Sequence, residues 1–490
     1  MRPLVLPVLP ALALAAACLF SSRISLGDEP AQGTNPAGTL RAGAAASNIT
    51  PPLGELIVGG FKPFPAKHVH DELHARCLVL DDGKTRIGIV LCDNVGIPRE
   101  VYDAAREMLP KEAGLAPANI LMAATHTHSA TTARTDNRTI KATKLTDYQQ
   151  FVACRIADGL VCAVNNLEPA RIGFGQVDVP EEVFNRRWYL SGDEKNLRNP
   201  FGGVDKVRMN PPRASSSLLR PAGPVDPQVS FLSVQSVDGR PISLIANYSL
   251  HYVGGVRGAD ISADYFAVFA DLIAEKLNAE KLSPPFVGIL SNGTSGDVNN
   301  IDFRSKGERR KPYEKMREVA GRVADAVYGA HQKIEFRSDV TLAAEMTELT
   351  LGVRKPTEEQ LAWARRLMAD PENAPKWHGV EMNYARRALV QNESPDEVSV
   401  PLQALRIGDV GIAAIPFEVF TEIGLEIKDK SPLKKTFTIE LANGSFAYLP
   451  TPEQHEVGGY ETWLGSNIVE YEASRKITRT ILDLLESISP

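Results

Sequence analysis

The spacing of apolar and polar residues changes repeatedly between the period of a strand and that of a helix. Two apolar runs flank Asp82 and Gly83 in RCLVLDDGKTRIGIVLCDN, which predicts a β-hairpin. Residues 145–167 have apolar side chains at helical spacing, with Thr146 placed to cap the helix, and residues 469–485 predict a second amphipathic helix. Because strands and helices are mixed throughout, we predict an α/β (mixed α+β) fold: one large domain with mixed β-sheets flanked by helices.

Residues 185–226 interrupt this pattern because they show little periodicity and are rich in glycine, proline and serine. A long segment of this kind inside a compact domain is either disordered or an ordered functional loop. It contains the large side chains Trp188, Tyr189, Phe201 and Met209, so we expect an ordered loop that packs over a cleft.

Several apolar runs end abruptly in polar residues that are capable of chemistry. In open α/β sheets ligands bind at the carboxyl ends of strands, so residues that follow different strands can meet there. We therefore expect the active site at the carboxyl ends of the strands. The polar residues at these ends are Asp93, Asn94, His126, His128, His251, Asp297 and Glu418.

The stretch LMAATHTHS places two histidines one residue apart directly after an apolar run. If the strand continues through them, His126 and His128 point to the same face. Two such imidazoles can bind one metal ion, or one can bind the metal while its neighbour transfers protons; an exposed polar loop is the alternative. His251 and Glu418 add a further histidine and a glutamate, and two histidines with one glutamate are a set found in catalytic zinc sites, which leaves a position for water or substrate.

The first residues indicate export. Arg2 precedes the apolar stretch LVLPVLPALALAAACLF, and polar residues follow, which predicts a secretory signal peptide at 1–27 and a flexible leader at 28–40. A lipoprotein acceptor at Cys18 is the alternative. No other segment is long and apolar enough to span a bilayer, so we expect a secreted or periplasmic protein. The net charge of -6 forms no basic stripe, which argues against nucleic acid as a partner.

Four motifs occur in a fixed order along the chain: ATHTHSA, NYSLHYVGG, IPFEVFTEIG and FAYLPTPEQHEVGGYETW. Together they resemble the N-terminal catalytic domain of the neutral/alkaline non-lysosomal ceramidases. The resemblance spans about residues 41–487, so we expect one catalytic domain at 41–490 without the C-terminal immunoglobulin-like domain of the full-length enzymes. It implies one zinc ion, Zn2+, held by His126, His251, Glu418 and Tyr448.

The resemblance also implies roles for residues beside the metal. His128 would transfer a proton or bind the carbonyl group, and Arg186 and Tyr460 would contact the scissile amide. Zinc supplies activated water near neutral pH, and these side chains supply hydrogen-bond donors and a proton. We therefore expect an exported zinc-dependent amidohydrolase whose substrate is ceramide or a related N-acyl compound.

One departure from the family affects this expectation. Ceramidases carry a serine two residues beyond a Gly-Asp pair, whereas SNGTSGDVNN has Asn299 at that position. A mechanism with zinc-activated water survives the change, and Asn299 either donates a hydrogen bond to the substrate or caps the turn. Two alternatives stay open: a zinc hydrolase of a non-lipid amide or ester, and a catalytically silent metal-binding homologue.

Overall fold

The computed structural model describes residues 39–131, 133, 138–140, 144–373 and 378–490, which fall within one compact unit. In this part of the chain the predicted α/β fold class is confirmed, because two large mixed sheets are flanked by helices. The first sheet has eight strands in the order β16 (Val287–Asn292), β14 (Pro241–Tyr248), β13 (Gln228–Ser236), β8 (Glu168–Asp178), β1 (Arg41–Asn48), β5 (His74–Asp81), β6 (Arg86–Cys92) and β7 (Ile120–Ala124). The second has the order β18 (Leu342–Gly352), β19 (Glu397–Ile407), β20 (Val410–Ile415) and β22 (Lys435–Glu440).

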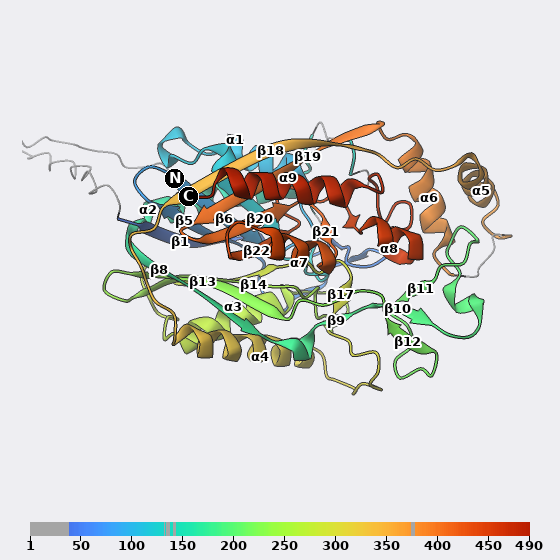
Figure 1. Ribbon diagram of the computed structural model, residues 1–490, viewed down its shortest axis with the longest axis horizontal. Helices are drawn as coiled ribbons and strands as arrows, with labels where there is room; N and C mark the ends of the chain where they lie inside the picture. Colours follow the sequence, from blue (N-terminus) through green and yellow to red (C-terminus); the bar gives the residue numbers. More distant parts are fainter. Residues whose placement is uncertain (1–38, 132, 134–137, 141–143, 374–377) are drawn as a thin grey trace, which may run out of the picture. The chain divides into compact units, whose positions relative to one another are not determined.

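The two sheets pack face to face and helices cover their outer faces. Apolar side chains of both sheets, such as Leu78, Leu232, Leu405 and Phe437, form one shared core. On the outer face of the larger sheet lie α1 (Arg99–Glu107), α2 (Asp147–Asn165), α3 (Asp264–Lys276) and α4 (Glu314–His331). On the smaller sheet lie α7 (Thr421–Lys430) and α9 (Ala473–Ser487), and Figure 1 shows α9 in red along β18 and β19. The result is a layered helix–sheet–sheet–helix arrangement.

The local elements follow the sequence pattern closely. β5 and β6 form the antiparallel hairpin predicted around Asp82 and Gly83. The Thr146 hydroxyl accepts a hydrogen bond from the backbone N–H of Gln149, whose side chain accepts one from the Thr146 N–H, and this capping box starts α2. The predicted final helix is present but begins at Ala473, because Val469 instead forms a bridge to Val353.

The strands that end in polar residues run in parallel pairs. β6 pairs with β7, β14 with β16, and β20 with β22, each in parallel. Beyond them, β21 (Glu418–Val419) pairs in parallel with β23 (Tyr448–Leu449), so that Glu418 lies directly opposite Tyr448. The sheet topology therefore brings the ends of these strands to a common edge.

Residues 185–226 are folded rather than forming a single loop. β10 (Arg187–Leu190) is the centre of a small sheet with β11 (Val207–Met209) and β12 (Leu218–Pro221). β9 (Phe184–Asn185) pairs with β17 (Val298–Asn299) next to the strand ends. The prediction of a loop was wrong because strands of two to four residues leave no readable alternation, but its large side chains are packed: Trp188 is buried, and Phe201 contacts Trp363.

Three further helices lie in the C-terminal part of the chain, before α9. They are α5 (Glu358–Ala369), α6 (Glu381–Asn392) and α8 (Pro452–Val457). Thr357 and Gln360 form the capping box of α5.

The predicted signal peptide at 1–27 lies outside the described residues, as do residues 28–38 of the leader. Leu40, which the prediction placed at the end of the leader, is fully buried, and its N–H donates to the Ser338 carbonyl. The ordered fold therefore begins before the predicted boundary. Among the described helices, none has the length and apolar character needed to cross a membrane.

Candidate metal centre

The two histidines of the THTHS motif lie beyond a strand that ends before them. β7 ends at Ala124, and His126 has a left-handed backbone with φ of 68°. Its N–H donates to the Asn94 carbonyl beyond β6, which fixes this turn. The assumption that the strand continues was wrong, but the turn brings the rings of His126 and His128 to a centroid separation of 4.6 Å.

Three histidines converge through their Nε2 atoms. Nε2 of His126 lies 3.1 Å from Nε2 of His251 and 3.0 Å from Nε2 of His128. His126 and His251 are almost completely buried, whereas His128 is partly exposed and stacks on Tyr252 with ring centroids 3.7 Å apart. The three side chains form a group whose nitrogen atoms are close enough to hold one metal ion.

The hydrogen bonds of the two buried histidines determine which ring nitrogen carries a hydrogen. Nδ1 of His126 lies 2.6 Å from the Val95 carbonyl oxygen, and Nδ1 of His251 lies 3.0 Å from that of Ser295. A carbonyl oxygen only accepts, so each Nδ1 donates and each neutral ring presents a lone pair at Nε2. Burial, and then the neighbouring His126, lowers the pKa of His251 well below its usual value, which favours the neutral ring. Two facing lone pairs 3.1 Å apart need a cation between or beside them.

A carboxylate from β21, just beyond the second sheet, completes this donor set. Oε2 of Glu418 lies 3.4 Å from Nε2 of His126, is buried, and receives no hydrogen bond from any described residue. Burial alone would raise the pKa of Glu418, but positive charge at the site, whether on His126, on His251 or on Arg138, holds it well below its usual value, so the carboxylate is ionised. An ionised oxygen without a hydrogen-bond donor, next to two imidazole lone pairs, fits a metal ion.

Tyr448 and Arg186 lie beside this group. Tyr448 lines a cavity of about 110 Å³ together with His126, His128 and Glu418. Its hydroxyl accepts a hydrogen bond of 3.1 Å from Nη2 of Arg186. Burial, followed by the Glu418 charge, raises the pKa of Tyr448, while Arg186 acts in the opposite direction. The predicted set of two histidines, one glutamate and one tyrosine is therefore gathered in one place.

Arg186 is held in place by a buried ion-pair network. Its Nε donates to Oε1 of Glu461 at 2.8 Å, and Nη2 also donates to the Gly296 carbonyl. Arg187, fully buried, donates to the other Glu461 oxygen at 2.7 Å. Tyr460, which precedes Glu461, lines the cavity and packs edge-to-face on Tyr448. Glu461 thus holds two neighbouring guanidinium groups at the site.

Both polar atoms of the Asn299 side chain form hydrogen bonds within the protein. Its amide nitrogen donates to Oδ1 of Asn210 at 2.8 Å, and its oxygen accepts from the N–H of Ile301 at 2.9 Å. The bond to the backbone two residues further on is an Asx-turn. Of the two predicted roles, the structure displays the turn.

Sequence reasoning missed several residues at the cavity. Phe61, Arg138 and Arg387 line it, and no motif marked them. Arg387 lies in the middle of α6, within the ordinary amphipathic pattern NYARRALVQN. Glu461 could have been found, because it directly follows Tyr460 and is a charged residue in an otherwise apolar turn.

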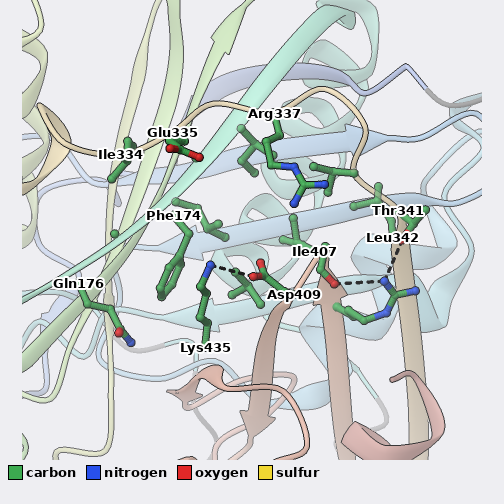
Figure 2. A pocket seen from close by; sticks show the side chains of 18 of the residues that line it. Phe174, Gln176, Ile334, Glu335, Arg337, Thr341, Leu342, Ile407, Asp409 and Lys435 are labelled. Carbon is green, nitrogen blue, oxygen red and sulfur yellow. Dashed lines mark hydrogen bonds and ion pairs between the residues drawn. The ribbon is translucent and has the colours of Figure 1, made fainter. Parts of the chain in front are cut away.

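A larger cavity lies away from these residues. It has a volume of about 1280 Å³ and is lined by residues of both large sheets, among them Phe174, Leu342 and Ile407. Figure 2 shows the Lys435 ammonium group directed at Asp409, 2.8 Å away. None of the predicted site residues lines this cavity, so its size alone does not mark it as the reactive site.

Comparisons with known proteins agree with the motifs. The family described as neutral/alkaline non-lysosomal ceramidase, N-terminal, matches residues 40–308. The fold is similar to the neutral ceramidase from Pseudomonas aeruginosa, at 16% identity and a TM-score of 0.66, over 92% of this chain and 74% of that chain. A structure described as ceramidase complexed with C2 is similar at 15% identity and a TM-score of 0.67, over 92% of this chain and 75% of that chain. Because the family match spans more than half of the sequence, this chain belongs to the neutral/alkaline non-lysosomal ceramidase family.

Proposed function

We propose that this protein is a zinc-dependent amidohydrolase that cleaves the C–N bond of an N-acyl amide with water. The observation that carries the proposal is the arrangement of two buried imidazole lone pairs and one carboxylate oxygen without a hydrogen-bond donor. Membership of the ceramidase family supports the reaction class. The donors are nitrogen and oxygen atoms of the kind that zinc binds in catalytic sites.

In this proposal His126, His251, Glu418 and Tyr448 hold the ion. When bound, zinc supplies a Lewis acid that polarises a carbonyl oxygen and acidifies water to a pKa near 7. The carbonyl groups of Val95 and Ser295 orient the two imidazole ligands, because each fixes an Nδ1 hydrogen.

The other side chains at the site would transfer the proton and stabilise the developing negative charge during cleavage of the amide. Water adds its oxygen to the acyl carbon, the C–N bond breaks, and a proton must reach the leaving nitrogen. His128 faces the cavity and is held against Tyr252, so it is placed to deliver that proton. Arg186 and Tyr460 are the expected donors to the oxygen on which negative charge develops.

Asn299 cannot form a covalent acyl-enzyme, because an amide side chain has no ionisable nucleophile. We therefore expect direct hydrolysis. A rapid-quench experiment tests this: a pre-steady-state burst with acyl label trapped on any side chain would overturn the direct mechanism.

The central test combines metal content with turnover on one sample. Protein stripped with a chelator should regain one zinc per chain and, only after zinc is restored, release carboxylic acid from at least one member of a panel of N-acyl amides that includes ceramide. His126→Ala, prepared in parallel, should do neither. Full zinc binding without hydrolysis of any amide or ester would instead favour a silent metal-binding homologue.

We infer export from the first residues of the chain. Arg2 and the apolar stretch after it have the composition of a signal peptide. Cell fractionation with sequencing of the mature N-terminus tests this inference, and a lipid-modified Cys18 would replace a soluble secreted form by an anchored one.

A further inference from the structure

The histidine cavity opens beside a second small cavity. The second has a volume of about 240 Å³ and shares Phe61 and Tyr460 with the first as lining residues. Its other walls include the apolar side chains Val207, Met209 and Trp463. Together the two cavities offer about 350 Å³, which is near the lower end of the range of about 300–1,000 Å³ that is usual for ligand pockets. The described walls therefore fit a compact substrate.

Arg387 is a cation of this site that no carboxylate neutralises. It projects from α6 to line the histidine cavity and lies near the Phe61 and Tyr384 rings, with centroids 5.6 and 5.0 Å from its guanidinium carbon. Among the described residues, no Asp or Glu forms an ion pair with it. A partly buried guanidinium with free donors next to a reactive site is available to an anion.

The neighbouring backbone leaves room for this side chain. Gly465 also lines the histidine cavity and has φ of 87°. A Cβ atom on Gly465 would lie 2.7 Å from Cβ of Arg387. Glycine at this position thus lets the Arg387 stem pass close to the loop that follows Tyr460.

Two further arginines lie near Arg387, beside one aspartate whose carboxylate is already hydrogen-bonded. Asp205 lines the second cavity, but its carboxylate already accepts from Asn199 Nδ2, the Gly459 N–H and Trp463 Nε1, at 3.0, 2.9 and 2.7 Å. Arg198 and Arg208 line the same cavity, and neither forms an ion pair with a described carboxylate. Apart from Glu418, which belongs to the proposed metal site, the carboxylate that lines these cavities is the saturated Asp205, and Arg387, Arg198 and Arg208 contribute positive charge without an ion-pair partner among the described residues.

We propose that the substrate carries a carboxylate that binds Arg387, which makes it a compact N-acyl amino acid. This rests on the proposed amide hydrolysis and names the substrate class of that site. A guanidinium recognises a carboxylate through two parallel hydrogen bonds, and its contacts with Phe61 and Tyr384 restrict its orientation in advance. Hydrolysis then releases a carboxylic acid and a free amino acid.

Two substrates that differ at one group test this assignment. N-Hexanoylglycine and N-hexanoylethanolamine share the acyl chain and the scissile amide, but the first carries a carboxylate where the second carries a hydroxymethyl group. Zinc-loaded protein should hydrolyse the glycine conjugate with a kcat/KM at least tenfold higher. The difference should appear mainly in KM, because the anion is bound equally in the ground and transition states.

Substitutions on α6 test whether Arg387 causes the preference for the glycine conjugate. Arg387→Met keeps the packing of the side-chain stem and should lower kcat/KM for the glycine conjugate at least tenfold more than for the ethanolamide. Arg387→Lys should restore part of the preference. Arg386→Met, an exposed change one residue away on the same helix, is the matched control and should alter neither substrate.

Binding separates this inference from the proposed reaction. Isothermal titration of N-hexanoylglycine into the metal-free protein should show binding that Arg387→Met weakens at least tenfold. If no amide is hydrolysed but this difference persists, the reaction fails and the carboxylate site stands. Equal binding by the wild type and Arg387→Met, or an ethanolamide cleaved as well as the glycine conjugate, would overturn the carboxylate site.

Discussion

The two cavities differ in how their polar groups are satisfied. In the larger one, of about 1280 Å³, the Lys435 ammonium pairs with Asp409 and the Arg337 guanidinium pairs with Asp339. All four of these side chains are substantially exposed to solvent. In the smaller one, of about 110 Å³, Oε2 of the buried Glu418 carboxylate receives no hydrogen bond from a described residue. We therefore assign the proposed reaction to the smaller cavity because of its unsatisfied buried atoms and not because of its volume.

The physical reason is the cost of desolvation. Paired charges in water are screened and have little further affinity for a ligand. A buried carboxylate and two buried lone pairs have lost their water, and a cation recovers much of that lost interaction. The smaller cavity should therefore respond strongly to single substitutions, and the larger one weakly.

The largest expected effect is loss of the metal. His126→Ala removes an imidazole whose Nε2 is within 3.1 Å of both other histidines. Zinc affinity should fall by more than the roughly 10–100-fold that changes outside the ligands cost, and hydrolysis should stop. Metal analysis and competition with a chelator measure this. Retention of zinc at wild-type affinity would exclude His126 as a ligand.

A second substitution divides the roles of the two neighbouring histidines. His128→Ala should keep zinc and lose a factor of about 10²–10⁴ in kcat, the usual contribution of a positioned proton donor. The same two assays apply. Because all three Nε2 atoms converge, zinc loss equal to that in His126→Ala would make His128 a third imidazole ligand instead.

The stability of the fold next to the smaller cavity should depend on the buried carboxylate of Glu461. Glu461→Gln leaves Arg186 and Arg187 without their shared charge partner. We expect the free energy of unfolding to fall by about 3–5 kcal/mol, the cost of breaking a buried ion pair from one side. Chemical denaturation measures it. Glu456→Gln, an exposed change on the adjacent helix, is the control and should leave stability near that of the wild type.

The fold should also lose stability in acid through His455, which lies on α8. Burial, and then Arg354 and Arg187, lowers the pKa of His455 to about 3. The unfolded chain binds a proton below about pH 6.5 whereas the folded chain does not, so the stability from this group is present above that pH and decreases as pH falls. From pH 6.5 to 5 the loss should be about 1–2 kcal/mol.

His455→Gln isolates this contribution. The difference in unfolding free energy between the variant and the wild type should shift in favour of the variant by that amount between pH 6.5 and 5. Denaturant titrations at several pH values measure the shift. A difference that does not change with pH would contradict a buried neutral histidine.

The smallest effect is expected at the larger cavity. Asp409→Asn removes the partner of Lys435, and both side chains are exposed. The free energy of unfolding should change by less than about 1 kcal/mol, as for other surface ion pairs. Hydrolysis should not change. A large loss of zinc or activity in this variant would contradict the contrast between the two cavities.

Local features of the fold were readable from the sequence. The hairpin at Asp82 and Gly83 and the capping box at Thr146 depend only on neighbouring residues, so their patterns identified them. The same holds for the apolar strands that end shortly before His126 and Glu418. The segment 185–226 was misread because its strands are too short to show alternation.

The sequence also determined which donors are available, since the histidines, the glutamate and the tyrosine follow or form strands in a family-like order. Only the tertiary structure decided how they meet. Glu418 reaches His126 because two sheets stack across a shared core, and the imidazole lone pairs are directed by backbone carbonyls of Val95 and Ser295. Arg387 comes from a helix without any motif. Backbone groups and packing contacts between distant segments have no signature in local sequence, because they depend on the folded position of the whole chain.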